Sequence, residues 1–331
     1  MKAVTYPAKG EVAFRDLPDP EPAAGEVLIR VRSSGICHTD IDVLHARYGS
    51  GAFPVVPGHE YAGEIVALGD AVSGLAVGDR VVVDPNLSCG TCRACLRGRE
   101  NLCVALGAYG VSEDGGFSEF SAVSARNLHV IGDLPFDQAA LAEPMGCVLN
   151  GVSTLGPRPN DEALIVGAGP IGLLLAIALR TQGVRTITLA DLNSARLALA
   201  ASFGFDGVES GSPAMTAMRR GMDICVDATG RPEVAGSLLD YAADGGSVLF
   251  FGVCPPDARI AISPFEVFRR QLRLQGTHSL NRNIPAALQA IRSYGPGIAG
   301  LVSHRVGLDE IAAILSSHGP AGSLKIQAEL P

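Results

Sequence analysis

Four cysteines stand close together in the first third of the chain and form its densest group of potential metal ligands. They are Cys89, Cys92, Cys95 and Cys103. Four thiolates at this spacing can enclose one zinc ion, and such a closed site leaves no position for a substrate, so we expect a structural role. Disulfides or a redox pair are the alternatives, and both are uncommon in chains of the reducing cytosol.

A second set of potential ligands is spread more widely along the sequence. It comprises Cys37, His59 with Glu60 beside it, and Glu143. A thiolate, an imidazole and a carboxylate leave a fourth position open, as in catalytic zinc sites, where the metal lowers the pKa of a bound hydroxyl. Taken singly, each residue has an ordinary interpretation as a buried thiol, a core histidine or a helix-terminal charge. Their spacing alone does not establish that they converge.

The glycine pattern Gly167-x-Gly169-x-x-Gly172 predicts a dinucleotide-binding turn. It follows an apolar segment and opens an apolar helix, with Pro170 at the first helical position. The first glycine permits the tight turn, the second admits the pyrophosphate, and the third allows close helix–sheet packing. The helix N-terminus supplies N–H donors to the phosphates. An ordinary glycine-rich turn in a parallel sheet is the alternative.

Asp191 lies 19 residues after Gly172, close to the separation of about 20 that places a carboxylate beside the adenosine ribose. A carboxylate there accepts both ribose hydroxyls and repels a 2′-phosphate, so we expect NAD. Arg196 could bind that phosphate, or it could lie against the adenine. A closed zinc site, an open zinc site and a nicotinamide site together indicate zinc-assisted hydride transfer.

The overall composition narrows the classes of function. The 331 residues are long enough for two domains, and 47% hydrophobic with 18% charged residues is typical of a globular chain. A net charge of −8 argues against a nucleic-acid surface. No apolar run approaches the roughly 18–20 residues of a membrane span, and the first residues do not read as a secretory signal. We therefore expect a cytoplasmic protein that binds neither nucleic acid nor a membrane.

Punctuated β-like segments fill residues 1–147 and favour a mostly β, partly barrel-like domain. From residue 148 to 284, strands and helices alternate, which predicts βαβ units and a parallel sheet covered on both faces. Residues 285–331 are expected to form two helices and a strand that return to the first domain. The predicted strands are 26–31, 62–67, 80–83, 118–123, 163–166, 186–190, 223–227, 247–252, 272–276 and 324–328; the predicted helices are 170–182, 194–203, 232–241, 285–291 and 308–315.

Five motifs in a fixed order resemble the zinc-containing medium-chain dehydrogenase/reductase family over essentially the whole chain. They are Gly35-Ile-Cys37-His38-Thr39-Asp40, Pro57-Gly58-His59-Glu60, the four-cysteine loop, Glu143-Pro144, and the glycine turn from Gly167 to Gly172. Glu143-Pro144 is similar to the branch of sorbitol, xylitol and threonine dehydrogenases. The resemblance implies an α/β fold: a Rossmann doubly wound parallel sheet (148–284) and a GroES-like catalytic domain (1–147), with the active site between them.

The same resemblance implies the roles of individual residues. Cys37 and His59 would bind a catalytic zinc, with Glu60 and Glu143 as direct or water-mediated ligands, and Thr39 would take the substrate proton. His38 stands where some members face the cofactor pyrophosphate. The implied NAD-contacting positions, beyond the glycine turn, are Ile171, Asp191, Arg196, Phe251, Gly252, Val253, Thr277, His278 and Ser279. Each subunit of a dimer or tetramer would hold one catalytic and one structural zinc.

The chain departs from the family pattern at three points. Asp42 stands where many relatives have the histidine that completes a proton relay, so the relay would use Asp42, His45 or the cofactor ribose; Asp42 as a solvated surface charge is an equal alternative. Ser279-Leu280 replaces the Arg-Tyr of sorbitol dehydrogenases, which argues against sorbitol itself. The chain is also somewhat short for the family.

These observations lead to one hypothesis: a zinc- and NAD-dependent dehydrogenase that oxidises a secondary alcohol of a polyol or sugar to the ketone. The alternatives are a threonine-type or simple-alcohol dehydrogenase, a non-catalytic NAD-binding relative, and a nucleic-acid-binding zinc protein. The set Cys37, Thr39, His59, Glu60 and Glu143 argues against the non-catalytic alternative, because such a protein has no need of an open metal position.

Overall fold

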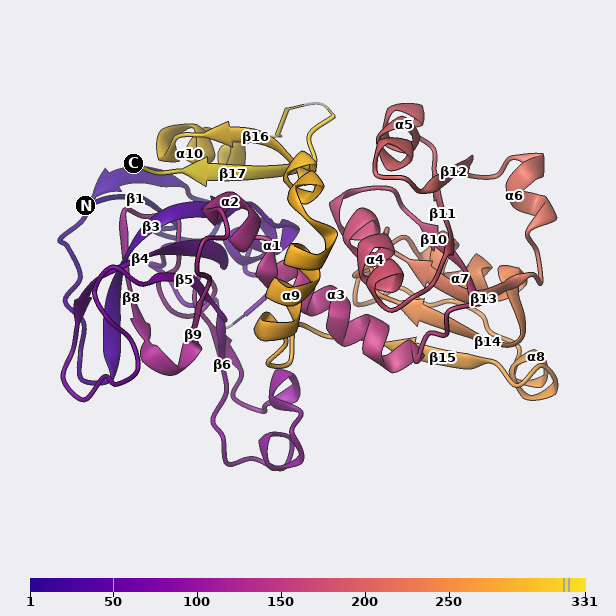
Figure 1. Cartoon of the computed structure of the whole chain (residues 1–331), viewed down its shortest axis with the longest axis horizontal. Helices are drawn as coiled ribbons and strands as arrows, with labels where there is room; N and C mark the ends of the chain where they lie inside the picture. The colour runs from indigo at the N-terminus through magenta and orange to yellow at the C-terminus, as the bar shows by residue number, and fades with distance from the viewer. Residues whose placement is uncertain (50, 318, 321) are drawn as a thin grey trace. The chain divides into compact units, whose positions relative to one another are not determined.

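The computed structural model describes residues 1–49, 51–317, 319–320 and 322–331, and these form two compact units (Figure 1). Unit 1 comprises Met1–Pro144 and Leu280–Pro331, and unit 2 comprises Met145–Ser279. The chain therefore leaves unit 1 once and returns to it after unit 2. These divisions lie a few residues before the expected boundaries at 147/148 and 284/285.

Unit 1 is built on a seven-stranded sheet within the described residues. Its main path has the order β16-β17-β3-β4-β5-β9, and β8 also pairs with β3. Two short hairpin-like pairs, β1 with β2 and β6 with β7, accompany it. The strands are β1 (Lys2–Thr5), β2 (Ala13–Asp16), β3 (Glu26–Gly35), β4 (Glu60–Leu68), β5 (Arg80–Val83), β6 (Asn86–Leu87), β7 (Gly107–Ala108), β8 (Phe120–Ser124), β9 (Leu128–Val130), β16 (Val302–Val306) and β17 (Lys325–Glu329).

β3 is the central strand of this sheet, where it pairs with β17, β4 and β8. Its apolar residues alternate along the strand. Val27, Ile29 and Val31 are fully buried on one face, as expected of a strand with one face in a core. Its antiparallel partner β4 begins opposite its end, where Gly35 pairs with Glu60. The chain segments that follow β3 and precede β4 are thereby brought together.

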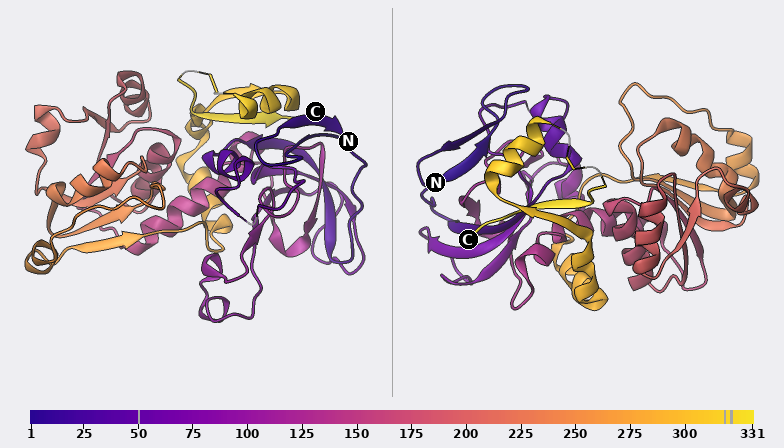
Figure 2. Two further views of the ribbon diagram at one scale, coloured as in Figure 1. Left: turned by 180° about the vertical axis from the view of Figure 1, so that it is seen from behind. Right: turned by 90° about the horizontal axis from the view of Figure 1, so that it is seen from above.

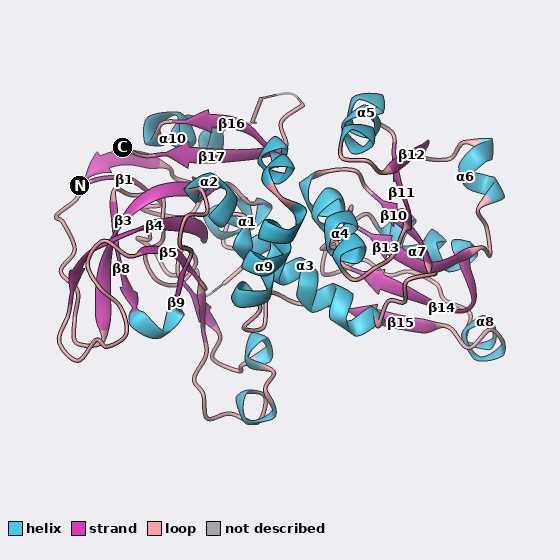
Figure 3. Ribbon diagram, viewed as in Figure 1, coloured by secondary structure: helices cyan, strands magenta, loops and turns pink. Residues whose placement is uncertain are grey.

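Unit 2 holds a six-stranded parallel sheet in the order β12-β11-β10-β13-β14-β15. This is the doubly wound order, with the crossover point beside β10. Helices lie on both faces of the sheet (Figures 2 and 3). The strands are β10 (Glu162–Val166), β11 (Thr186–Asp191), β12 (Asp206–Glu209), β13 (Met222–Asp227), β14 (Ala242–Phe250) and β15 (Arg273–Gly276). The predicted fold class, a doubly wound sheet plus a mostly β domain, is confirmed.

The helices differ mainly in how much apolar surface they bury. α4 is apolar on all sides and almost wholly buried, which is why it reads as a core helix rather than an amphipathic one. The helices are α1 (His38–Leu44), α2 (Phe136–Ala139), α3 (Ala142–Leu155), α4 (Pro170–Thr181), α5 (Ser194–Ser202), α6 (Pro213–Ala217), α7 (Pro232–Tyr241), α8 (Pro264–Arg269), α9 (Ile284–Tyr294) and α10 (Leu308–Ser316), with 3₁₀ turns η1 (Cys95–Arg97), η2 (Glu100–Leu102), η3 (Ala125–Asn127) and η4 (Pro296–Leu301). Among the described residues, no helix is both long enough and apolar enough to cross a membrane.

Some elements carry no clear sequence signal. β12 has the sequence Asp-Gly-Val-Glu, and β16 has Val-Ser-His-Arg-Val. Neither contains a continuous apolar run, because both lie at a sheet edge and bury little. Their places follow from pairing with β11 and β17, which only the folded chain provides.

The close packing at Gly172 predicts that even a methyl side chain there lowers the stability of the protein. A Cβ at Gly172 would lie 1.9 Å from the carbonyl oxygen of Gly167. We expect Gly172→Ala to destabilise the protein by about 1–3 kcal/mol, because the backbone of the turn must move. Thermal and urea unfolding would measure the effect.

Gly169→Ala is the matched control in the same turn. A Cβ there would meet only Arg196 Nη1, at 3.9 Å, and Gly169 has a φ of −76° that any residue can adopt. Its unfolding should match that of the unmodified protein. Equal stability of the two variants would contradict the packing argument.

Candidate metal centre and nucleotide site

The end of β3 and the start of β4 carry the three ligands of the candidate catalytic site. Cys37 follows β3 by two residues and caps α1, and its N–H donates to Asp40 Oδ2 at 2.8 Å. His59 and Glu60 stand at the start of β4. The potential ligand atoms of Cys37, His59 and Glu60 all lie within 4.8 Å of one another. The structure thus brings together three residues that sequence spacing alone could not.

Asp40 orients the histidine. Its carboxylate is fully buried, and Oδ1 lies 3.2 Å from Nδ1 of His59 while also accepting from the N–H of Gly58 at 3.3 Å. Burial opposes protonation of the imidazole, but Asp40 and then Cys37 outweigh it and raise the pKa of His59 well above its ordinary value. With Nδ1 facing a carboxylate, Nε2 is the nitrogen left for a metal, which is the usual carboxylate–histidine–metal arrangement.

Lys325, on the C-terminal strand β17, is the residue that sequence analysis missed. Its Nζ pairs with both carboxylate oxygens of Glu60, at 2.6 Å for Oε2, and lies 3.4 Å from the carbonyl oxygen of Ile36. Both charged groups of the pair are almost completely buried. Burial by itself lowers the pKa of the ammonium, but Glu60 first, and then Cys37, overcome this effect and raise the pKa of Lys325.

A sequence signal for Lys325 exists, although it is weak. Lys325, Gln327 and Glu329 alternate with Ile326 and Ala328, which suggests a strand with one polar face in water. In the structure, Lys325–Ala328 are buried on both faces. Buried cations require a partner, so a lysine on a covered strand would have pointed to a buried carboxylate.

The remaining catalytic candidates lie near this group. The hydroxyl of Thr39 is 3.7 Å from the sulfur of Cys37. Glu143, at the start of α3, is buried and close enough to Lys325 to raise the pKa of that ammonium. The group of ligands within 4.8 Å does not include Glu143.

The residues present fit a zinc ion. A sulfur, an imidazole nitrogen and a carboxylate oxygen are the donors that zinc takes; His59 and Glu60 are buried, and Cys37 is partly exposed. The ammonium of Lys325 pairs with both carboxylate oxygens of Glu60. The buried negative charge of Glu60 is therefore balanced without a metal ion. Cys37 and His59 are therefore the stronger candidates for metal ligands, because the carboxylate of Glu60 is already paired with an ammonium.

His38 and Asp42, also on α1, are not part of the ligand group of Cys37, His59 and Glu60. The His38 side chain is 83% exposed and its Nε2 is 4.0 Å from Asp42. Asp42 accepts a hydrogen bond from Arg47 Nε at 2.9 Å. This pairing favours Asp42 as a surface charge over Asp42 as a proton relay.

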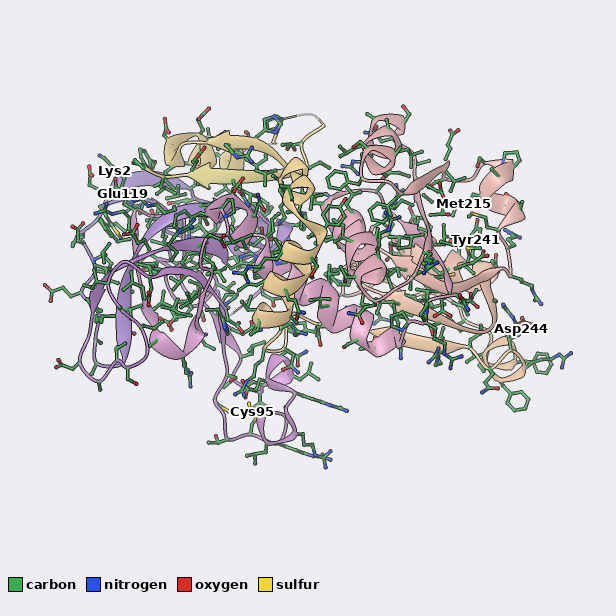
Figure 4. All side chains as sticks on the ribbon, viewed as in Figure 1. Lys2, Cys95, Glu119, Met215, Tyr241 and Asp244 are labelled. Atoms are coloured by element: carbon green, nitrogen blue, oxygen red, sulfur yellow. The ribbon has the colours of Figure 1, made fainter. Side chains whose placement is uncertain are left out.

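The four clustered cysteines converge as expected of a closed metal site. Their sulfurs lie within 4.8 Å of one another in a lobe that leaves the sheet of unit 1 between β6 and β7, where Figure 4 labels Cys95. The N–H of Cys92 and that of Cys89 point at cluster sulfurs, at 3.4 Å and 3.3 Å. Hydrogen bonds from the Thr91 and Cys92 N–H groups lower the pKa of Cys89 to about 6. None of the chain's cysteines, all of which are described, forms a disulfide. The geometry favours thiolate ligands.

The glycine turn joins β10 to α4 in unit 2. Gly167 has a φ of 108°, and Gly169 caps the helix ahead of Pro170 and Ile171. Asp191 ends β11, and its carboxylate accepts from the N–H of Ala168 at 2.8 Å. The carboxylate is therefore fixed at the edge of the turn, where a bound nucleotide would place its ribose.

The other predicted cofactor residues follow neighbouring strands. Arg196, on α5, lies with Nη1 3.7 Å from Asp191 Oδ2. Phe251 and Gly252 follow β14, and both N–H groups donate to the Asp227 carbonyl oxygen; Val253 beside them is 88% exposed. The carboxyl ends of parallel strands are where ligands bind in this fold class.

The segment after β15 has a partner that sequence analysis also missed. Thr277, His278 and Ser279 each offer an oxygen to Nδ2 of Asn150 on α3, at 3.4, 3.2 and 2.8 Å. Asparagine is too common for its sequence position to have been a signal. Its role is visible only once α3 and β15 are adjacent.

Comparisons with known proteins agree with this architecture. Family models described as "Alcohol dehydrogenase GroES-like domain" and "Zinc-binding dehydrogenase" match residues 23–133 and 170–293. D-altritol 5-dehydrogenase of Agrobacterium fabrum is 54% identical over 315 residues, which cover 94% of each chain. This chain belongs to the zinc-containing medium-chain dehydrogenase/reductase family.

Two further relatives show how broad this family is. L-threonine 3-dehydrogenase of Saccharopolyspora erythraea is 34% identical over 83% of this chain and 82% of its own. A Sinorhizobium meliloti protein, described as a zinc-binding dehydrogenase and solved with NADP, superposes with a TM-score of 0.95 at 32% identity, over 99% of each chain. Membership of this dehydrogenase family confirms an oxidoreductase that uses zinc and a nicotinamide cofactor.

The buried pair predicts a large stability effect in this dehydrogenase. We expect Lys325→Met to cost about 3–5 kcal/mol in urea unfolding, because Glu60 would be left buried without a counter-charge. The double variant Lys325→Met/Glu60→Gln should recover part of that loss. Lys2→Met, which removes an exposed pair with Asp16, is the control and should change little. A Lys325 variant no less stable than the Lys2 variant would refute the role of the pair.

The cysteine lobe predicts a change in metal content. We expect Cys103→Ser to lose one zinc per subunit and to lower the melting temperature by at least about 4 °C, because the metal contributes to folding. Atomic emission and calorimetry would measure both. Cys254→Ser, outside either cluster, should keep both metals. Full zinc content in the Cys103 variant would rule out the closed four-thiolate site.

Proposed function

We propose that this dehydrogenase oxidises a secondary alcohol of a polyol to the ketone, with NAD as the hydride acceptor. The observation that carries the proposal is the convergence of Cys37, His59 and Glu60, with the Thr39 hydroxyl beside the cysteine. The 54% identity with a D-altritol 5-dehydrogenase supports a hexitol-like substrate. The domain roles follow: unit 1 holds the metal, and unit 2 holds the cofactor.

The chain's own residues would prepare the substrate for hydride loss. When bound, zinc supplies Lewis-acid polarisation of the substrate hydroxyl, and the nicotinamide accepts the hydride. Thr39 would hold the hydroxyl by a hydrogen bond and take its proton, because its oxygen lies beside the Cys37 sulfur. Asp40 would keep the His59 ring in one orientation throughout. Glu143 and Glu60 would supply negative charge near the metal, partly balanced by the ammonium of Lys325.

The route of the proton beyond Thr39 is narrowed by the ion pair of Asp42. Because Arg47 holds the Asp42 carboxylate, we infer that the relay runs through the cofactor ribose or His45. His38 would contribute to the pyrophosphate site from its exposed position on α1. These roles rest on the family resemblance and on the placement of each side chain.

Two observations bear on cofactor and substrate choice. Asp191 favours NAD, since its carboxylate would repel a 2′-phosphate. Arg196 beside it could instead bind that phosphate, and one relative was solved with NADP. Leu280 is fully buried, and no guanidinium stands at the Ser279-Leu280 position. We infer that polyol hydroxyls are recognised by other groups than in sorbitol dehydrogenases.

A threonine-type activity is the second candidate, because a threonine dehydrogenase is among the relatives at 34% identity. The threonine-type activity is the less favoured candidate, because the polyol enzyme has the higher identity. We further infer a cytoplasmic homo-oligomer, a dimer or tetramer, by resemblance to the family.

The substrate assignment is tested by NADH formation at 340 nm over a panel of C4–C6 polyols, threonine, ethanol and isopropanol, with NAD or NADP. We expect chelator-sensitive turnover on hexitols, with higher kcat/KM for NAD. A preference for threonine would establish the second candidate instead. Higher kcat/KM with NADP would overturn the assignment of Asp191.

Matched variants test the roles within the site. Thr39→Val should lower kcat by about 10²–10⁴-fold, because the proton has no acceptor, whereas Thr39→Ser keeps the hydroxyl and should retain most activity. Cys37→Ser should lose the catalytic metal and on the order of 100-fold or more in kcat. A Thr39→Val enzyme as active as Thr39→Ser would exclude the proton role.

A further inference from the structure

The cysteine lobe, residues 86–108, is fastened to the point where the chain re-enters unit 1. We call residues 280–283 the crossover segment, because Ser279 belongs to unit 2 and Leu280 to unit 1. At the base of the lobe, Asn86 Nδ2 donates to the carbonyl oxygen of Leu280 at 2.9 Å. The first residue of the crossover segment is therefore held by the strand that opens the lobe.

The tip of the lobe makes a second contact, with Asn281, the next residue of the crossover segment. The N–H of Glu100 donates to Asn281 Oδ1 at 3.1 Å, and Asn281 Nδ2 donates to the carbonyl oxygen of Gly98 at 2.8 Å. One amide side chain thus satisfies a donor and an acceptor of the lobe backbone. A reciprocal pair of this kind fixes both distance and orientation.

The carboxylate of Glu100 completes the attachment. It accepts from Arg282 Nε at 2.8 Å, and a second guanidinium nitrogen of Arg282 pairs with its other oxygen. Ser88 Oγ also donates to it, at 2.9 Å, so the carboxylate is only 17% exposed. Two-point pairing between a guanidinium and a carboxylate gives geometric specificity as well as energy.

The metal ligands bracket Glu100 along the chain. Ser88 directly precedes Cys89, and the N–H of Cys103 donates to the carbonyl oxygen of Glu100 at 3.0 Å. A metal that fixes Cys89 and Cys103 therefore also fixes the residues that grip the crossover segment.

The crossover segment directly follows, along the chain, the predicted cofactor loop Thr277–Ser279, to which Asn150 Nδ2 donates. Ser279 and Arg282 both have positive φ, 53° and 57°, in the left-handed region that non-glycine residues seldom adopt. Such conformations persist where neighbouring contacts over-determine them. Here those contacts are Asn150 for Ser279 and Glu100 for Arg282.

We propose that Glu100 is a positioning residue for cofactor binding: the metal lobe, through Glu100, sets the path of the crossover segment and so the placement of the adjoining loop Thr277–Ser279. The proposal rests on the proposed cofactor role of that loop. Under this proposal the closed metal site affects cofactor binding without touching the cofactor or the substrate.

The test uses Glu100→Gln, Arg282→Gln and their double variant in the full-length zinc-loaded enzyme. Hydrogen–deuterium exchange of peptides covering 277–283 should become faster in each. The NADH dissociation constant and the KM for NAD should rise about three- to tenfold, while kcat at saturating NAD stays within about twofold. The double variant should be no worse than either single variant, because both remove the same pair.

Asp16→Asn is the matched control, since it also converts an ion-paired acid into an amide in unit 1. It should change neither exchange nor NADH affinity. Unchanged exchange in 277–283, unchanged NADH affinity, or loss of a zinc equivalent in Glu100→Gln would each overturn the proposal. If the unmodified enzyme binds no nicotinamide cofactor, the proposed function fails, and the exchange measurement still decides whether Glu100 holds the segment.

Discussion

The structure of unit 1 depends on a buried ion pair between Lys325 of β17 and Glu60 of β4. Removing two charges from water is costly, and the pair persists only because β3 lies between its two strands and aligns them. β3 pairs with β4 on one side and with β17 on the other. The central strand therefore aligns both the candidate metal ligands and the cation that pairs with one of them.

The two cysteine-containing sites differ in how their ligands are held. The four clustered cysteines lie on a single short lobe, so their convergence is local and the spacing of the sequence reveals it. Cys37, His59 and Glu60 converge because two long strands pair in register, a non-local event. This difference explains why one site can be read from spacing, while the other requires the resemblance to known dehydrogenases or the fold itself.

The sequence predicts much of the fold for the same reason. The strand–helix alternation and the glycine turn of unit 2 are local patterns, and the predicted parallel sheet was confirmed. The edge strands β12 and β16 were not predicted, since they bury too little to leave an apolar pattern. Lys325 and Asn150 escaped prediction because each polar side chain acquires its role from a partner that lies far away in sequence. The role of Asp42 was left open by the sequence, because its partner Arg47 lies beyond the end of α1 and the path of the chain there decides the pairing.

The discontinuity of unit 1 has a consequence for synthesis of the chain. Residues 280–331, which include β17, leave the ribosome after all of unit 2, so the six-stranded sheet of unit 2 can form while the sheet of unit 1 still lacks its C-terminal strands. During that interval Glu60 lacks the ammonium of Lys325, so the group Cys37, His59 and Glu60 carries more net negative charge before residues 280–331 are added than after. The order of synthesis thus leaves the candidate metal group without its internal cation until β17 has joined the sheet.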